Sequence, residues 1–422
     1  MTQGLAPAAA PAPAGTRALI SRRSSGDTPG RMRLVSAALV VVGLLVGLGA
    51  AQSFSAADGA LARADENAAQ LVRLQGIQTS LVRADADATN SFLVGGLEPV
   101  DQRRDYDGAI ENAARLVAFA ARAQPADGEA LAALSAAIEG YAGGVVQART
   151  VNRQGLPLGA QYLRDASASL RSGALPLLES LTTANEQRVQ LEFTTARDAR
   201  ALAVGAALAG LVLVAAALVW LARRTHRYLN LPVVGAGGVV LVILVTSAVV
   251  LGSVAGSVAA VRDGSYATAR ALAGARVAAF DAKANESLTL ISRGSGAAFE
   301  AAWVTSSAVT TSELAKAPTA LRESWTGYVG LHQKIRALDD GGGWDQGVAA
   351  ATTRDAGSAN ATFDTFDSAS GEQLTRAGHE TSSALRTAAS GLGLGAWLSV
   401  LGGILAAALA WRGLSRRIEE YR

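Results

Sequence analysis

Residues 85–92 read DADATNSF and residues 281–288 read DAKANESL, so the chain contains nearly the same octapeptide twice, 196 residues apart. The residues that follow repeat in the same order, at offsets of 187, 190 and 186. The repeated pairs are Gly140-Tyr141 with Arg149 against Gly327-Tyr328 with Arg336, Arg164-Asp165-Ala166 against Arg354-Asp355-Ala356, and Glu186-Gln187 against Glu372-Gln373. Such drift is expected where loops gain or lose residues while helices keep their register. The pattern predicts a tandem duplication of one structural unit.

Each unit begins and ends in a long apolar stretch. The four stretches are residues 34–54, 201–222, 232–256 and 391–412, and their interiors carry no charged residue. Each is long enough to cross a hydrocarbon core of about 30 Å. The whole chain is 50% hydrophobic and 17% charged, which is too apolar for an ordinary soluble protein. The sequence therefore predicts a membrane protein that crosses the bilayer four times.

The charges predict how the chain is oriented. Segments 1–33 and 223–231, together with the end of the chain from residue 412, carry twelve basic residues and three acidic ones. By the positive-inside rule these segments are cytoplasmic, and residues 55–200 and 257–390 face outward from the cell membrane. Segment 1–33 is rich in Ala and Pro and is expected to be a disordered tail, while 413–422 is a short cytoplasmic tail. The net charge of +3 is thus a topology signal and does not indicate nucleic-acid binding.

Both outward segments have the pattern of helices, without alternating runs of β-branched residues. In the first copy the predicted helices run from span one to Gly95-Gly96, from Pro99 to before Pro125, from about Gly128 to Val151, and from about Pro157 through a kink at Pro176 into span two. The second copy repeats this order. The fold class is therefore an all-α membrane protein with four transmembrane helices and two tandemly duplicated extracytoplasmic four-helix bundles.

Small residues recur in the predicted spans at a spacing that lets membrane helices pack closely. The pairs are Gly43 with Gly47, Gly252 with Gly256, and Gly391 with Gly395. Frequent glycine in any membrane helix is the alternative explanation. The predicted bundles are rich in alanine, and each buried alanine contributes little apolar area. We therefore expect the two bundles to depend on each other, or on a partner, for stability.

The sequence carries no sign of an enzyme. It has no cysteine, and its three histidines, His226, His332 and His379, are isolated and are expected to be solvated surface residues. We expect no cofactor and no metal. The cytoplasmic segments are too short to fold into a kinase or a cyclase, so a partner must process any signal. The spans lack the charged residues typical of a transporter.

Polar residues of the repeat form a candidate binding set in which an acid would meet an ammonium group and an arginine would meet a carboxylate. The candidates are Asp85, Thr89, Tyr141, Arg149, Asp281, Asn285, Tyr328 and Arg336. Such a set would suit an amino-acid ligand. The alternative is structural: the acids and arginines pair between helices to set the register of the bundles, and the tyrosines close the core.

A helix that leaves the first span and ends in Asn90-Ser91-Phe92-Leu93-Val94-Gly95-Gly96, with a last helix that enters the second span, resembles the four-helix-bundle sensor modules of bacterial chemoreceptors and sensor kinases. Two such units with almost no cytoplasmic domain resemble the actinobacterial membrane component of the glutamate/aspartate-sensing system. That resemblance implies two partners, an extracytoplasmic amino-acid-binding lipoprotein and a cytoplasmic Ser/Thr kinase, and a function in transmembrane signal relay.

Two other functions stay open at this point. The chain could be a structural or scaffolding subunit of a cell-envelope complex without a ligand of its own, or the outer bundles could capture a ligand directly. The oligomeric state is also open, and a homo-oligomer is one alternative.

Overall fold

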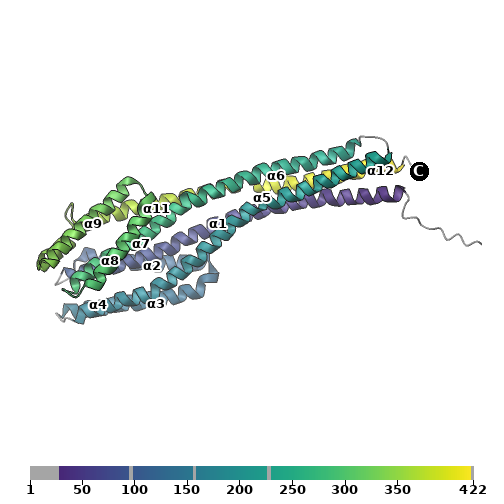
Figure 1. Ribbon diagram of the computed structural model, residues 1–422. Helices are drawn as coiled ribbons and strands as arrows, with labels where there is room; N and C mark the ends of the chain where they lie inside the picture. The colour runs from purple at the N-terminus through teal and green to yellow at the C-terminus, as the bar shows by residue number, and fades with distance from the viewer. Residues whose placement is uncertain (1–27, 95–97, 155–157, 226–229, 420–422) are drawn as a thin grey trace, which may run out of the picture.

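The computed structural model describes residues 28–94, 98–154, 158–225 and 230–419, which form helices joined by short connections and contain no strand (Figure 1). The helices are α1 (Thr28–Leu93), α2 (Val100–Ala123), η1 (Pro125–Asp127), α3 (Gly128–Arg153), α4 (Leu158–Ser169), η2 (Leu170–Ala174), α5 (Leu175–Thr225), α6 (Leu231–Asp263), α7 (Ser265–Ile291), α8 (Ala297–Glu313), η3 (Leu314–Lys316), α9 (Thr319–Asp340), α10 (Trp344–Thr352), α11 (Ala359–Ala389) and α12 (Leu392–Glu419). The prediction of an all-α fold is confirmed.

Some predicted boundaries lie outside the described residues. These are the helix end at Gly95-Gly96, the helix start at Pro157, the middle of the hairpin with His226, and the tail up to residue 27. The chain is already helical from Thr28, so the disorder predicted for the whole of 1–33 is wrong for its last residues. Arg31 and Met32 are good helix formers, and the side chain of Met32 is buried, which extends the helix past the apolar stretch.

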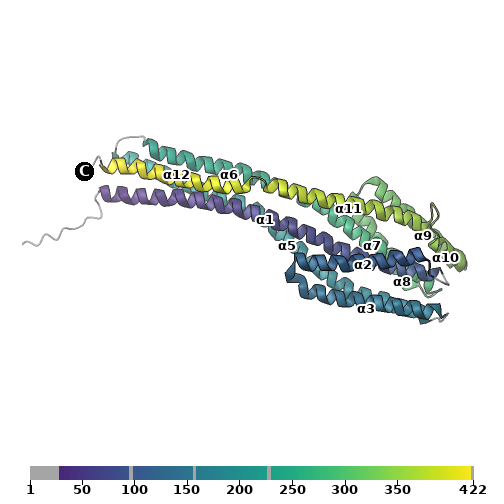
Figure 2. The same ribbon diagram turned by 180° about the vertical axis from the view of Figure 1, so that it is seen from behind.

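Four helices among the described residues are long and apolar enough to cross a membrane, and they contain the four predicted spans. They are the first half of α1, the second half of α5, α6 and α12, which lie side by side at the end of the molecule that holds the C-terminus (Figures 1 and 2). Their outer surfaces expose large apolar side chains such as Leu45, Val212 and Leu401. A surface of this kind suits lipid, and the chain is a multi-pass membrane protein.

Two glycines of α1 allow close packing inside the membrane section. A Cβ on Gly47 would lie 2.6 Å from the Cα of Gly403 in α12, and a Cβ on Gly43 would lie 3.0 Å from the backbone nitrogen of Ala407. The two backbones therefore touch, as small residues permit. Because of this approach, any side chain larger than hydrogen at Gly47 would push α1 and α12 apart.

The other glycines expected to pack between spans have different surroundings. A Cβ on Gly395 would lie 2.9 Å from the ring of Phe54, and one on Gly252 would lie 3.4 Å from the guanidinium of Arg200. Gly256 and Gly391 would meet nothing within 4 Å, so the structure does not place them in a helix contact. Gly391 instead has φ +85, a left-handed conformation that glycine adopts without a steric penalty.

The rest of the chain forms two bundles at the opposite end of the molecule (Figures 1 and 2). The first consists of the second half of α1, α2, α3 and the α4–η2–α5 segment, and its core is mainly Leu, Ala and Val with Tyr106 and Tyr141. The second consists of α7, α8, α9 and the α10–α11 segment, and its core is aromatic, with Trp303, Trp325 and Phe366. The predicted pair of four-helix bundles is confirmed.

The two bundles share a central seam in which α1 packs along α7. Val82, Ala86 and Leu93 of α1 belong to the core cluster of the second bundle. Both octapeptides lie on these two helices, so the duplicated segments meet in the middle of the molecule. The first copy therefore supplies part of the second bundle's core.

The copies differ in how they reach the membrane. In the first copy α1 and α5 run without a break from the bundle into the membrane section. In the second copy the chain breaks at Gly264, between α6 and α7, and at Ser390-Gly391, between α11 and α12. The expectation that the second copy also feeds a continuous helix into its last span is therefore wrong, because Gly391 adopts a positive φ that ends α11.

The predicted kink at Pro176 is a π-helical turn, Leu170–Ala174, which lies just before the proline. Proline has no N–H to donate and its ring clashes with the carbonyl four residues earlier, so the helix widens there to accommodate it. The turn also carries Arg171, which proves central to the site.

Candidate functional site

The aspartates that open the two octapeptides bind the same arginine. Arg171 donates from Nη1 to Asp85 at 2.8 Å and from Nη2 to Asp281 at 2.9 Å. Its Nε also donates to Asp281, at 3.1 Å. One guanidinium therefore links α1 of the first copy to α7 of the second.

Asp85 is the more buried of the two acids, with 1% of its side chain exposed, against 24% for Asp281. It also accepts hydrogen bonds from the hydroxyls of Ser167 and Tyr141. Its charge is thus met by one cation and two hydroxyl donors, which is what a buried carboxylate requires. Thr89, one turn further along α1, donates to the carbonyl of Asp85 and holds the helix locally.

Asp281 lies at the edge of a cavity and has a different set of partners. Ser306 of α8 donates to its Oδ2 at 2.6 Å, and Asn285 donates to the same oxygen at 3.0 Å. Burial alone would lower the pKa of Arg171, but the two aspartates raise it, so the arginine stays charged. The triad Asp85–Arg171–Asp281 is the charged centre of the seam.

Further ion pairs join the copies along the same seam. Arg83 of α1 pairs with Asp367 of α11 at 3.0 Å, and Arg354 pairs with Asp105 of α2 at 2.9 Å. Asp87 lies beside them, and burial raises its pKa to about 7, with Arg83 acting in the opposite direction. The Asp87 carboxyl, at the boundary between the copies, is therefore partly protonated near neutral pH.

Arg149 does not reach Asp85. It pairs with Glu98 at 2.7 Å, and its guanidinium lies over the ring of Tyr106, 4.2 Å from the centroid. Its side chain is buried, and its Nε and Nη1 have no hydrogen-bond partner within the described part of the chain. Tyr141 and Arg149, eight residues apart on α3, thus contact two separate polar groups.

In the second bundle, a chain of charged side chains runs from the core to the surface. Lys283 and His332 each contact Glu286 at 2.8 Å. His332 reaches Glu300 at 3.3 Å through its other ring nitrogen, and Arg336 contacts Glu300 at 3.3 Å. Arg336 also pairs with Asp339 and Asp340 at the end of α9.

His332 is therefore not the solvated surface residue that its isolation in the sequence suggested. It is 1% exposed and stacks on Trp303, with ring centroids 3.5 Å apart. The expectation was wrong because the acids that contact it come from α7 and α8, which are distant in sequence. His379 is exposed as expected, and His226 lies outside the described residues.

The charges of the side chains around Glu286 depend on one another. Burial would raise the pKa of Glu286, but Lys283 and His332 lower it to about 2. Burial opposes the charge on His332, but hydrogen bonds to Glu286 and Glu300 raise its pKa above the usual value. Tyr328 is fully buried beside the group, with the Lys283 ammonium 5.3 Å from its ring centroid. Burial of this kind favours a fixed, fully paired network.

The eight candidate residues thus fall into three groups. Asp85, Thr89 and Tyr141 surround the first octapeptide, Asp281 and Asn285 lie across Arg171 from them, and Arg149, Tyr328 and Arg336 lie in other polar clusters. Asp281 lines one cavity, in the seam between the copies, and the walls of that cavity contain none of the other seven. The pairing of acids and arginines between helices matches the structural alternative more closely than a single amino-acid pocket.

Sequence reasoning missed Arg171 because it searched for residues present in both copies. The equivalent stretch of the second copy, from Gly357 to Ala361, contains no basic residue. One signal could have indicated it. Asp85 and Asp281 occupy equivalent positions in the repeat, and neither has a basic residue three or four positions away on its own helix, so each needs a basic partner from another helix. No group of three potential metal ligands occurs among the described residues.

Comparison with known proteins bears on the first bundle. Curated proteins and solved structures give no match to the chain. Residues 60–194, from the middle of α1 through α5, match the family model described as an actinobacterial sensor domain. The matched segment contains Asp85, Tyr141 and Arg171, and so most of the first bundle's side of the seam. The match supports a sensor protein from actinobacteria, with a sensing and signalling role.

Proposed function

We propose that this chain is a transmembrane sensor and signal relay, in which the two bundles receive a cue outside the cell and the membrane helices carry it to the cytoplasm. The observation that carries the proposal is the match of residues 60–194 to a sensor domain. That segment begins and ends in helices that continue into the membrane section, so a change in the bundle has a direct mechanical route inward.

The relay needs two states whose balance a ligand can alter. The seam offers such an element, because ion pairs between the two bundles lie beside its apolar contacts. A difference of about 1–3 kcal/mol in ligand affinity between two arrangements of the bundles would suffice for regulation. The continuous helices α1 and α5 would carry the first copy's displacement through the bilayer.

The output would pass through the two cytoplasmic elements of the chain, the hairpin 223–231 and the tail 413–422. Asn230 donates to the carbonyl of Gly413 at 3.0 Å, so the start of α6 contacts the end of α12. A Cβ on Gly413 would lie 2.9 Å from the Asn230 side chain, which shows how closely the two elements approach. A partner that touches both elements could therefore sense a movement of α6 relative to α12.

The partners proposed are those implied by the resemblance to the glutamate/aspartate-sensing system. An amino-acid-binding lipoprotein would dock on the outer bundles, and a soluble Ser/Thr kinase would read the cytoplasmic surface. The short cytoplasmic segments leave signal processing to another protein, and the kinase would fill that role.

The orientation can be tested first, because the chain has no native cysteine. Single cysteines at Asp101, which is 75% exposed on α2, and at Arg412, at the cytoplasmic end of α12, would be labelled in intact cells with a membrane-impermeant maleimide. We expect labelling of Asp101→Cys alone. Labelling of Arg412→Cys instead would reverse the proposed topology.

The relay itself is tested by deleting Ser415 to Arg422, which leaves Gly413 and the buried Leu414 in place. We expect loss of amino-acid-dependent phosphorylation by the kinase, while a lipoprotein still co-purifies with the chain. An unchanged response would remove the tail from the mechanism. Recovery of cell-wall enzymes in place of a lipoprotein would favour the scaffolding function.

A further inference from the structure

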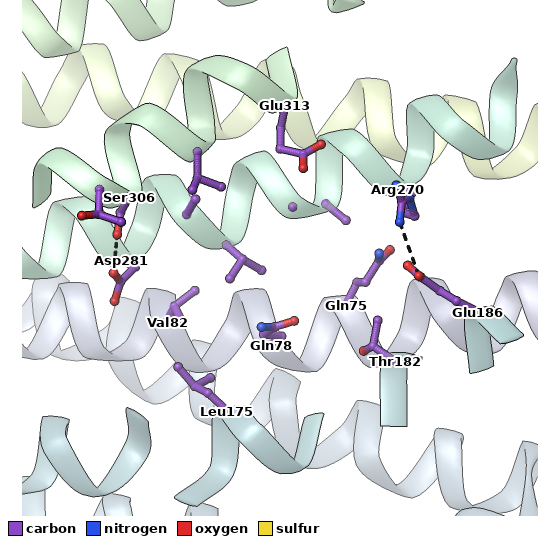
Figure 3. Close-up of a pocket in the computed structure, with 16 residues that line it drawn as sticks. Gln75, Gln78, Val82, Leu175, Thr182, Glu186, Arg270, Asp281, Ser306 and Glu313 are labelled. Carbon is purple, nitrogen blue, oxygen red and sulfur yellow. Dashed lines mark hydrogen bonds and ion pairs between the residues drawn. The ribbon is translucent and has the colours of Figure 1, made fainter. Parts of the chain in front are cut away.

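A cavity of about 380 Å³ lies in the seam between the copies, and Asp281 of the Arg171 triad is one of the residues that line it (Figure 3). Its walls are α1 and α5 of the first copy and α7 and α8 of the second. Asp281 and Ser306 lie at one end, and Arg270 and Glu186 at the other, as Figure 3 shows. The volume is in the range of small-molecule sites, about 300–1,000 Å³.

Several polar groups in the cavity have no partner among the described residues. Gln75 is 6% exposed, points from α1 toward α7 in Figure 3, and its Oε1 accepts no hydrogen bond. The hydroxyl of Thr182 is also buried without a partner. Buried polar atoms are almost always hydrogen-bonded in folded proteins, so unpartnered oxygens facing a shared space indicate a missing donor.

Two of the three acids that line the cavity, Glu186 and Asp281, have an arginine partner. Arg270 contacts Glu186 at 3.4 Å, and Arg171 pairs with Asp281. Glu313 takes part in no ion pair or hydrogen bond with the described residues. It points from α8 into the cavity in Figure 3, and its carboxyl carbon would lie 3.5 Å from a Cβ placed on Gly274 of α7. The cavity therefore presents one uncompensated carboxylate.

An apolar strip completes the cavity. Val82, Leu175, Val277 and Val309 line the part near Asp281. A ligand that fits these walls has an aliphatic part for the strip and hydrogen-bond donors for the unpartnered oxygens. Its positive charge would meet Glu313.

We propose that the cavity between the bundles binds a small molecule that carries a primary ammonium group, with Glu313 as its counter-ion and Gln75 and Thr182 as hydrogen-bond acceptors. Amino acids and aliphatic diamines share this chemistry. Because two walls come from each copy, the bound molecule would hold the two bundles in one arrangement. The binding site stands on the cavity alone; only its role as the input depends on the function proposed above.

The test uses the full chain purified in nanodiscs. Thermal unfolding and isothermal titration would be measured with the twenty amino acids, with putrescine, and with succinate as a dicarboxylate that has no ammonium group. We expect at least one ammonium compound to bind and to raise the unfolding temperature, as any ligand specific for the folded state does. Binding of putrescine without any amino acid would assign the source to diamines, and the converse to amino acids.

Three variants complete the test. Glu313→Gln removes the counter-ion and should weaken binding tenfold or more, and Gln75→Leu should weaken it as well. Glu323→Gln, an exposed carboxylate on α9 of the same copy, should bind as the unaltered chain does. If Glu313→Gln fails to fold, Gln75→Leu decides.

The proposal is overturned if no ammonium compound binds, if succinate binds equally well, or if Glu313→Gln and Gln75→Leu both retain full affinity. These measurements do not involve the cytoplasmic tail. A chain that binds the ligand but signals normally after deletion of the tail would contradict the proposed relay and leave the site intact. A chain that binds no ammonium compound but loses its response when the tail is deleted would contradict the site and leave the proposed relay intact.

Discussion

The two copies share one helix order but meet the membrane differently. The first copy sends α1 and α5 into the membrane section as continuous helices, whereas the second is broken at Gly264 and again at Gly391. The cores differ too, since the first is mainly aliphatic with two tyrosines, whereas the second is rich in aromatic rings and contains the buried Lys283–Glu286–His332 network. The two copies thus share a topology, but the first is joined to the membrane section by continuous helices and the second by interrupted ones.

The seam explains why this divergence can persist. Asp85 and Asp281 are equivalent in the repeat, but one arginine from the first copy pairs with both. Because Arg171 comes from one copy and binds the equivalent aspartates of both, it fixes how the copies pack. Residues away from this contact can then differ between the copies. The predictions that follow test the difference between the copies, in order of decreasing effect.

Replacing Glu286 by Gln should have the largest effect, because it leaves the Lys283 ammonium buried without its counter-ion. We expect a loss of about 3–5 kcal/mol in the free energy of unfolding. Asn90, 196 residues earlier, is the matched control, and Asn90→Ala should cost only about 1 kcal/mol through its bond to the carbonyl of Ala351. Denaturant unfolding of the full chain in detergent measures both, and equal losses would contradict the proposed difference between the cores.

Replacing Arg171 by Leu should cost about 2–4 kcal/mol, since both Asp85 and Asp281 lose their cation but the arginine is partly exposed. Arg164→Leu, on the exposed side of α4, should change the unfolding free energy by less than about 0.5 kcal/mol. Unfolding in detergent again gives the comparison. If Arg171→Leu were as mild as the control, the triad would not hold the copies together.

The break before α12 can be tested at one pair of positions. Gly391 lies 186 residues after Gly205, the same spacing as between Glu186 and Glu372, but Gly205 is inside the continuous helix α5. Gly391→Ala should cost about 1–2 kcal/mol because alanine resists a positive φ. Gly205→Ala should instead stabilise by about 0.5–1 kcal/mol. Thermal unfolding would show shifts of opposite sign, and shifts of the same sign would argue against a real difference in backbone conformation.

The smallest expected effect is a pH dependence of the free energy of unfolding that arises from His332 in the second bundle. The pKa of His332 is raised in the folded chain, so its contribution to stability is fully present below the unfolded pKa near 6.5 and is lost as the pH rises through the folded value. The slope cannot exceed about 1.4 kcal/mol per pH unit for one proton. His332→Phe should flatten the dependence above about pH 6.5, as measured by unfolding at several pH values. A slope that the variant leaves unchanged would assign the proton to another group, such as Asp87.

The helices and spans could be predicted because their signals are local. A run of apolar residues specifies a membrane helix whatever surrounds it, and Pro99, Pro125 and Pro176 mark helix starts and distortions through their own covalent geometry. The repeat could be found because both copies kept the same residues at matching offsets. Charge asymmetry along the chain led to the proposed orientation in the same way.

The partners of these residues were decided by tertiary structure. Whether Asp85 would meet Arg149 or Arg171 depends on which helices face each other within the first bundle, and no local pattern contains that information. His332 was predicted to be solvated, but the packing of α7 and α8 against α9 places Glu286 and Glu300 in contact with it. The cavity exists only because four helices from two copies leave a space that their side chains do not fill. Sequence by itself determined the elements, since their energies arise within a few neighbouring residues, and packing between distant segments decided the charges, breaks and cavity.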